Sequence, residues 1–435
     1  EEHPLLQSAQ GVETYDGGEK EVVLVHTKKR SSIGTGVIFF KASFGVGSLG
    51  VPYAFRQGGI VTGLVATAGV TVLITYTLIM LLRSVDKLRA DGAKVHTLAE
   101  FGAACWGWKG EKSVTGALLG CQLGTLVAYF IFAATSLTGL IMPFFDLNFS
   151  SAERYNLYLL ILVLLVPLMS MIVALIRDMH IIDTLVFLSM GIMLTGICEI
   201  VGYGLINPTL CGTADHAIWC PMHMFTSFEN IPIVVGVVTF ALEGLPTVLP
   251  IERTMEDPRQ YKTVVVWSMA ALGAAYAGLG TLFYALFGHN TTSVIALDVS
   301  GPVGTLVKLQ LTLVVFLSFP LQFLPIREVV EKQSLKWNLS RRASILAEAS
   351  VLGACGLTAA LLPHFGALLS LVGCICFSFL GFLVPPYAWL MLGKPGPVTV
   401  ALAMCCVAFG LMEMIFGTVS NINELAKHYG EVAKM

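Results

Sequence analysis

The stretch KASFGVGSLGVPYAF, residues 41–55, decides the fold of this chain. It lies in the first long apolar segment, yet it contains three glycines and a proline: Gly45, Gly47, Gly50 and Pro52. Each glycine weakens a helix by about 1 kcal/mol relative to alanine, and the proline removes a backbone donor. The pattern therefore predicts a helix that is interrupted within an apolar segment.

The composition of the whole chain indicates that a lipid bilayer surrounds it. Of the 435 residues, 55% are hydrophobic and 12% are charged, and the mean hydropathy is +0.78. Soluble domains contain about 25% charged residues. Apolar windows of about twenty residues, the length that crosses the hydrocarbon core, recur along nearly the whole sequence. We therefore predict an all-α integral membrane protein, with the bilayer as a partner and no nucleic acid.

Eleven apolar segments are predicted to span the membrane. They divide the chain into a cytosolic tail over residues 1–30, a membrane domain over 31–420 and a short tail over 421–435. We expect no cleavable signal peptide. The predicted spans are residues 34–56, 60–83, 113–146, 155–176, 181–206, 228–251, 263–288, 302–326, 344–362, 365–391 and 397–419.

The distribution of basic residues predicts the orientation of these spans. With the N-terminus in the cytosol, twenty of the 26 Lys and Arg residues fall on the cytosolic side and four on the opposite side. This excess follows the positive-inside rule. Eleven crossings then place the C-terminus outside the cell or in a lumen.

Two features of the predicted outer loops agree with this orientation. The sequons at Asn148 and Asn290 both fall in outer loops, which makes them candidate glycosylation sites. Cys211 and Cys220 share the long loop after the fifth span and are able to close a disulfide in an oxidising compartment. The cysteines lack the four convergent ligands of a structural zinc site, so no metal is predicted.

A second interruption is predicted in the sixth span, VVGVVTFALEGLPTVLPIERTMEDP, residues 234–258. Gly244, Pro246 and Pro250 break the apolar run, and Glu243 lies at the point of interruption. A carboxylate in the middle of a span costs at least about 2.5 kcal/mol, and such residues almost always face a cavity or a partner.

The first and sixth spans are corresponding members of two sets of five, where inverted-repeat transporters place their paired broken helices. A break in mid-membrane exposes backbone N–H and C=O groups, which suit the two charges of an α-amino acid. The carboxylate would bind N–H groups near Gly47 and Ser48, and the ammonium would reach carbonyls around Thr239 and Phe240. Close helix packing is the alternative explanation of the glycines.

The two interrupted stretches also carry a family resemblance. FFKASFGVGSLGVPYAFRQGG (39–59) and FALEGLPTVLPIERTMEDP (240–258) are similar to motifs of the amino acid/auxin permease family. They resemble most closely its proton-coupled amino acid transporters and the related vacuolar transporters. The resemblance implies a LeuT-type fold, with two inverted repeats of five helices and an eleventh helix, and secondary active transport of amino acids.

The resemblance also implies residue roles. It assigns substrate-site positions to Gly45, Val46, Gly47, Ser48, Gly50, Thr239, Phe240 and Gly244.

A proton-coupling role is implied less directly. Lys41 matches a lysine that precedes the first break in the family. Mammalian proton-coupled members have a histidine three residues earlier, where this chain has Ile38. Glu243 is therefore the first candidate for the protonated group. The alternative is a structural Glu243 that pairs with Lys41 or caps freed backbone amides.

Other polar residues inside the predicted spans are secondary candidates. Gln122 and Tyr129 are seven residues apart, so they share a helix face and are candidates to line the substrate cavity. Ser318 and Gln322 are four apart and are candidates to face the first break, where sodium-coupled relatives hold their ion. Interhelical packing or hydrogen bonding is the alternative for each.

Two further carboxylates, Glu199 and Glu413, lie inside the fifth and eleventh predicted spans. Charged groups are costly there, and the sequence does not identify their partners.

These observations predict a transporter of small or neutral amino acids that works by alternating access and is driven by protons, with no cofactor. Sodium coupling and an amino acid sensor with the same binding site are the alternatives. An enzyme is not expected, because no nucleophile is paired with a base and no metal ligands cluster. The plasma membrane and a vacuolar or lysosomal membrane both fit, and the sequence leaves transport direction, side-chain selectivity and oligomeric state open.

Overall fold

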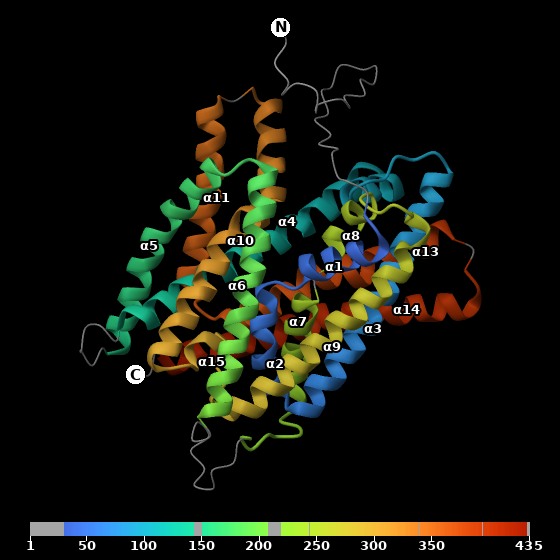
Figure 1. Ribbon diagram of the computed structural model, residues 1–435. Coiled ribbons are helices and arrows are strands. Elements are labelled where there is room, and N and C mark those ends of the chain that lie inside the picture. Colours follow the sequence, from blue (N-terminus) through green and yellow to red (C-terminus); the bar gives the residue numbers. More distant parts are fainter. Residues whose placement is uncertain are drawn as a thin grey trace.

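A computed structural model describes residues 30–142, 150–207, 219–242, 244–338, 340–393 and 395–432. Within these ranges every regular element is a helix (Figure 1), apart from an isolated backbone bridge between Arg30 and Met255. Ten helices are long and apolar enough to cross a membrane, or eleven if one bent pair is counted as a span. The prediction of an all-α membrane protein is confirmed.

The bent pair is the stretch with which the sequence argument began. Helix α1 (Ser32–Ser43) ends, the short 3-10 helix η2 (Val46–Gly50) follows, and α2 (Val51–Gly58) continues the span. The two halves meet at an angle of 56°. Ser31 caps the start of α1, and Pro52 lies in the first turn of α2, where its missing N–H group removes no helical bond. The predicted interruption of the first span is confirmed.

The sixth span is also divided, but with a different geometry. Helix α7 (Ile231–Ala241) ends at Leu242, and α8 (Leu245–Glu252) begins after Gly244. Together the two helices fall within one candidate span, Phe228–Glu252. Glu243 itself lies outside the described residues.

The other helices before the tenth predicted span are unbroken except α4. In α4, Trp106 and Gly107 leave helical geometry, which separates the first part of the helix, capped by Thr97, from the membrane-spanning part. These helices are α3 (Ile60–Ala90), α4 (Leu98–Ile141), α5 (Ser151–Leu175), α6 (Met179–Ile206), α9 (Tyr261–Phe287), α10 (Gly301–Lys336) and α11 (Arg341–Leu361).

The last two spans contain π turns. In the tenth span two π turns join α12 to α13, and in the eleventh one π turn joins α14 to α15. Helix α15 continues to Val432, beyond the predicted end of the eleventh span at residue 419. The extension is polar, and its side chains find partners on α2 and α12. The elements are α12 (Phe365–Val372), η9 (Gly373–Phe377), η10 (Phe379–Leu383), α13 (Val384–Leu392), α14 (Pro397–Met412), η11 (Glu413–Gly417) and α15 (Thr418–Val432).

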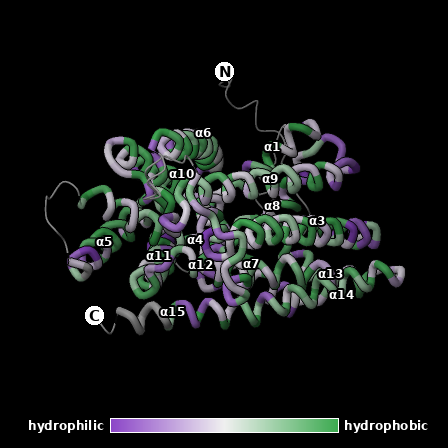
Figure 2. The backbone as a smooth tube through the Cα atoms, turned by 90° about the horizontal axis from the view of Figure 1, so that it is seen from below, coloured by the Kyte–Doolittle hydropathy of each residue, from purple (hydrophilic) through white to green (hydrophobic). Residues whose placement is uncertain are grey.

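Burial places the broken spans at the centre of the bundle. In the most apolar window of Phe228–Glu252, 71% of the residues are buried, against 33% for α5 and 28% for α6. Helix α7 packs against α2, α3 and α12, while α1 packs against α8 and α9 (Figure 1). The outer helices are largely hydrophobic between their ends (Figure 2), apart from α15, as expected for surfaces that face lipid.

Glycines allow the central helices to approach closely. A Cβ atom at Gly373 would lie 1.9 Å from the carbonyl oxygen of Gly236, so no side chain fits between α7 and the tenth span at this point. Small residues at such contacts are typical of membrane helix packing. The broken sixth span is therefore held tightly on one side by the tenth.

Candidate functional site

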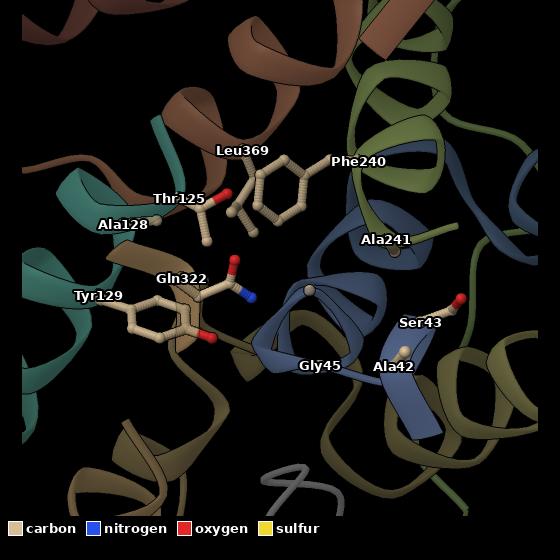
Figure 3. A pocket seen from close by; sticks show the side chains of 11 residues that line it. Ala42, Ser43, Gly45, Thr125, Ala128, Tyr129, Phe240, Ala241, Gln322 and Leu369 are labelled. Carbon is tan, nitrogen blue, oxygen red and sulfur yellow. The ribbon is translucent and has the colours of Figure 1, made fainter. Parts of the chain in front are cut away.

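A cavity lies at the break of the first span (Figure 3). Its walls come from the end of α1, the start of η2, the end of α7, and α4, α10 and α12. The residues that line it are Ala42, Ser43, Gly45, Gly47, Thr125, Ala128, Tyr129, Phe240, Ala241, Gln322 and Leu369.

Gly45 and Gly47 both line the cavity, but they differ in their surroundings. Gly45 has an extended backbone with φ −113° and ψ −162°, and a Cβ atom there would meet no atom within 4 Å. At Gly47 a Cβ atom would lie 3.0 Å from the Cα atom of Ala241 and 3.2 Å from the Phe240 ring. Gly45 therefore borders open space, whereas Gly47 also lets the two broken spans touch.

Three other predicted site residues do not line the cavity. Gly50 packs on Leu369, because a Cβ atom added at Gly50 would lie 2.4 Å from the Cδ1 atom of Leu369. A Cβ atom at Gly244 would lie 2.9 Å from the Phe39 ring. The N–H group of Ser48 donates to the Gly45 carbonyl at 3.0 Å, so one of the amides predicted to hold the substrate carboxylate is already bonded. At Val46 only the backbone is described.

The sixth span contributes Phe240 and Ala241 to the cavity wall. Thr239 is buried and does not line it. Its hydroxyl group faces Glu413 of the last span instead. Phe240 thus lies on the wall of this cavity, while Thr239 has a different neighbour.

Helices α4 and α10 supply the polar side chains of the cavity. The Gln322 amide points into it between Tyr129 and Gly45 (Figure 3). Thr125, which the sequence argument missed, lies one turn before Tyr129, and its hydroxyl donates to the Cys121 carbonyl at 2.9 Å. A search for polar residues four apart from Tyr129 would have found it. Gln122 is buried outside the lining.

A second cavity adjoins the first and shares Ala42, Gly45, Tyr129 and Gln322 with it. It extends between α1, α6 and α10. The remaining residues that line it are Lys41, Phe44, Val186, Ser189, Met190, Met193, Val314, Ser318 and Leu321.

Two of the predicted coupling residues lie in this second cavity. The Lys41 ammonium is 4.7 Å from the centre of the Phe187 ring, within the range of a cation–π contact. The Ser318 hydroxyl is 3.0 Å from that of Ser189. Ser318 and Gln322 thus both lie near the first break, as the sequence predicted.

The predicted outer end of α2 is tied to two loops. The Gln57 carbonyl accepts hydrogen bonds from the Thr226 hydroxyl and, at 2.8 Å, from the Asn230 amide. Arg56 donates to the Thr291 carbonyl at 2.9 Å. These contacts hold the outer half of the first span in place above the cavity.

Asp298 belongs to the same outer loop. It accepts from the Thr292 N–H group at 3.0 and 3.1 Å. Burial raises the pKa of the Asp298 carboxyl from 3.8 to about 7, although the Thr292 hydrogen bonds and the charge of Arg56 oppose this shift. The loop thus contains an acid that changes charge near neutral pH.

Ion pairs join the helices at the predicted cytosolic end. Arg89 of α3 contacts Glu252 of α8 at 2.9 Å, and Arg177 contacts Glu348 of α11 at 3.2 Å. Arg30 exchanges backbone hydrogen bonds with the segment after α8. Contacts therefore tie helices together at both ends of the central bundle.

The predicted modification sites are partly described. Asn290 is exposed at the end of the short 3-10 helix η7 (Gly288–Asn290), and Cys220 is buried nearby. Asn148 and Cys211 lie outside the described residues. Glycosylation and the disulfide remain predictions.

The sequence matches a known family over most of its length. A family model described as transmembrane amino acid transporter protein covers residues 28–423. The chain belongs to this family. The resemblance to amino acid/auxin permeases is therefore confirmed, and members of the family are transporters and not enzymes.

Individual relatives in the transmembrane amino acid transporter family are distant but align over most of the chain. Amino acid transporter AVT3C of Arabidopsis thaliana is 27% identical over 416 residues, which cover 89% of each chain. The proton-coupled amino acid transporter-like protein pathetic of Drosophila melanogaster is 25% identical over 422 residues, 89% of this chain and 84% of the relative. Vacuolar amino acid transporter 3 of Saccharomyces cerevisiae is 22% identical over 409 residues, which cover 90% of this chain and 56% of the relative.

Proposed function

We propose that this chain transports small or neutral amino acids by alternating access in a LeuT-type arrangement, two inverted repeats of five spans and an eleventh span, with a cytosolic N-terminus. The observation that carries the proposal is the open space beside Gly45, at the break of the first span. Broken helices that border a cavity near the middle of the bundle are the usual substrate sites of such transporters.

The lining of the cavity favours a neutral substrate. Among its described residues no side chain is charged, so an extra charge on the substrate would lack a partner there. The backbone at the start of η2 offers N–H groups to the carboxylate, and the end of α7 offers carbonyls to the ammonium. Gln322 and Tyr129 complete the polar contacts.

A proton gradient is the proposed energy source. Glu243, at the second break, is the first candidate for the carrier, with Lys41 close to the first break as its counterpart. The Drosophila relative is described as proton-coupled transporter-like, which supports the same choice. Sodium is the alternative, with the Ser318 hydroxyl and the Gln322 amide as oxygen ligands. The relatives described as vacuolar amino acid transporters favour a vacuolar or lysosomal membrane, with the plasma membrane as the alternative.

The test is uptake of a panel of labelled amino acids into proteoliposomes with a pH gradient, a sodium gradient or neither. In the parent we expect the uptake of neutral amino acids to follow the pH gradient. In Glu243→Gln we expect uptake to depend less on that gradient. Gly45→Val should lower uptake at least about tenfold, because its side chain fills the cavity. Gly69→Val is the control, since its Cβ atom also meets open space but lies on α3 away from the cavity.

Three results would contradict parts of this proposal. Uptake that follows sodium would overturn proton coupling and leave the site intact. Equal uptake by Gly45→Val and the parent would overturn the site. Amino acid binding without uptake would make the protein a sensor.

A further inference from the structure

The last span contains a buried carboxyl group that the proposed substrate site does not use. Glu413 is 5% exposed, and neither of its carboxylate oxygens has a hydrogen-bond partner among the described residues. A buried acceptor without a partner is costly, and a charged one costs more. A group this costly in a membrane helix usually has a function.

The neighbours of Glu413 suit an uncharged carboxyl. The hydroxyls of Thr239 and Ser378 lie near it without forming a hydrogen bond to it, since the Ser378 hydroxyl donates to the Gly373 carbonyl at 3.1 Å, and the Cys374 thiol is also close. In the described part of the chain Glu413 forms no ion pair. The described residues of α7 contain no titratable group, and residues 365–383 of the tenth span contain only cysteines. A carboxyl group without a cation in such surroundings is most stable when it carries a proton.

The helices around Glu413 have irregular hydrogen bonding. Glu413 begins the π turn η11, which packs against η9 and α7. Glycines bring these segments close: a Cβ atom at Gly417 would lie 2.2 Å from the Cys374 sulfur, and one at Gly236 would lie 2.5 Å from it. Because π turns in membrane and soluble helices occur frequently at functional sites, this junction is a candidate for movement.

Glu413 is linked to the substrate cavity through α7. Thr239, which faces it, immediately precedes Phe240 and Ala241, and both of these line the cavity. The Thr239 hydroxyl is itself buried without a hydrogen-bond partner among the described residues. A change in the protonation of Glu413 therefore acts on the final turn of α7, next to the second break.

A line of polar groups leads from Glu413 along the last span. Asn421 and Glu424 lie eight and eleven residues further on, on the same helix face. The Asn421 amide donates to Ser370 at 2.8 Å, and Glu424 accepts from the Tyr53 hydroxyl at 2.7 Å. One oxygen of Asn421 and one of Glu424 are buried without a partner among the described residues.

Polar residues continue along α15 toward its C-terminal end. In Figure 2 hydrophilic residues interrupt the apolar colour along α15, which lies at the edge of the bundle. The C-terminal end of this helix lies on the predicted outer side. Along the last span, Asn421 and Glu424 therefore lie between that side and Glu413.

We propose that Glu413 is a proton-binding site, reached along Asn421 and Glu424 and coupled to the substrate cavity through Thr239. This inference rests on proton-driven transport as proposed above, and it adds a carrier on the last span to the candidate at Glu243.

The experiment compares the parent with Glu413→Gln in proteoliposomes, using the panel of labelled amino acids. We expect uptake driven by a pH gradient to fall at least about tenfold, while exchange at equal pH stays within about twofold. Glu413→Asp should retain the gradient dependence because it keeps the acid. Glu199→Gln is the matched control, since Glu199 is also inside a span but accepts from Gln310 at 2.9 Å.

The outcomes separate this inference from the proposed function. Gradient-driven uptake at the parent level in Glu413→Gln would overturn the inference, as would loss of both uptake and exchange in the Gln and Asp variants. If the parent shows no uptake driven by a pH gradient, the proposed proton coupling fails, and infrared spectroscopy decides about Glu413. A protonated-carboxyl C=O band that disappears in Glu413→Gln would support the site, and an unchanged band would overturn it.

Discussion

The two broken spans contain similar residues but differ in shape. The first bends by 56°, and its Gly45 borders open space. The sixth keeps both halves within one candidate span, and its Gly244 is packed against Phe39 and Ser43. Thus the break in the first span forms the cavity, while the break in the sixth span supplies one wall of it and packs against neighbouring helices. Glycine in a membrane helix marks either an opening or a close contact, and only its neighbours distinguish the two.

The largest effect should come from substitution where the two breaks touch. Gly47→Val should lower the free energy of unfolding by about 1 to 3 kcal/mol, since its Cβ atom would press on the Ala241 backbone. Thermal unfolding in detergent measures this, with Gly45→Val as the matched variant that we expect to unfold like the parent. Unchanged unfolding of Gly47→Val would mean that the breaks are free to separate.

Gly244→Ala sharpens the comparison within the second break. We expect a loss of about 1 kcal/mol, smaller than at Gly47, because the added methyl group meets the tip of the Phe39 ring and not a backbone atom. Gly45→Ala is the control, which should leave the unfolding temperature unchanged. Equal losses at the two positions would show that both breaks are packed alike.

The outer half of the first span should be sensitive to pH through Asp298. Its pKa lies near 7 in the folded protein, above its ordinary value of 3.8, so the folded state holds a proton that the unfolded state releases between these values. Stability is therefore lost as pH rises through 7, by about 1 kcal/mol between pH 6 and pH 8.

Unfolding temperatures at pH 6 and pH 8 test this prediction. The expected decrease is about 1 to 2 °C for a chain of this length. Asp298→Asn should remove that part of the pH dependence. The same pH dependence in the variant would assign it to another group.

The smallest effect concerns the cavity that the first break opens. Gln322→Ala should raise the KM for a neutral amino acid about threefold, because one substrate hydrogen bond contributes about 0.5 to 1.5 kcal/mol. Gln310→Ala is the control, since Gln310 is on the same helix but contacts Glu199 outside the cavity. An unchanged KM in the first variant would exclude Gln322 from substrate binding.

Much of the fold could be predicted from the sequence because its signals are local. The predicted spans agree with the observed helices to within a few residues at most ends. Exceptions are α4, which begins at Leu98, before the predicted start at 113, and three helices that continue past their predicted ends: α3 to Ala90 instead of 83, α10 to Lys336 instead of 326, and α15 to Val432 instead of 419. These extensions are polar, so hydropathy does not detect them. The Glu331 side chain of α10 contacts Arg177 at 3.2 Å, a distant partner that stabilises the extra turns.

The site was predictable only in part. Gly45, Gly47, Tyr129, Phe240 and Gln322 line the cavity as the motifs and spacings indicated. Which side of a helix faces inward depends on its rotation within the bundle, and the sequence alone does not set this. For that reason the prediction included Gln122, which lies outside the lining, and missed Thr125 and Ala128.

The sequence by itself determined that this chain is helical, spans a membrane and breaks its first and sixth spans. Those properties follow from apolar length and from glycine and proline, which act on their own segment of backbone. The tertiary structure decided that Gly45 opens a cavity, that Gly244 fills a contact, and that Glu413 lies behind the cavity wall without a partner among the described residues. These depend on distances between helices that are far apart in the chain, and only the packed bundle fixes them.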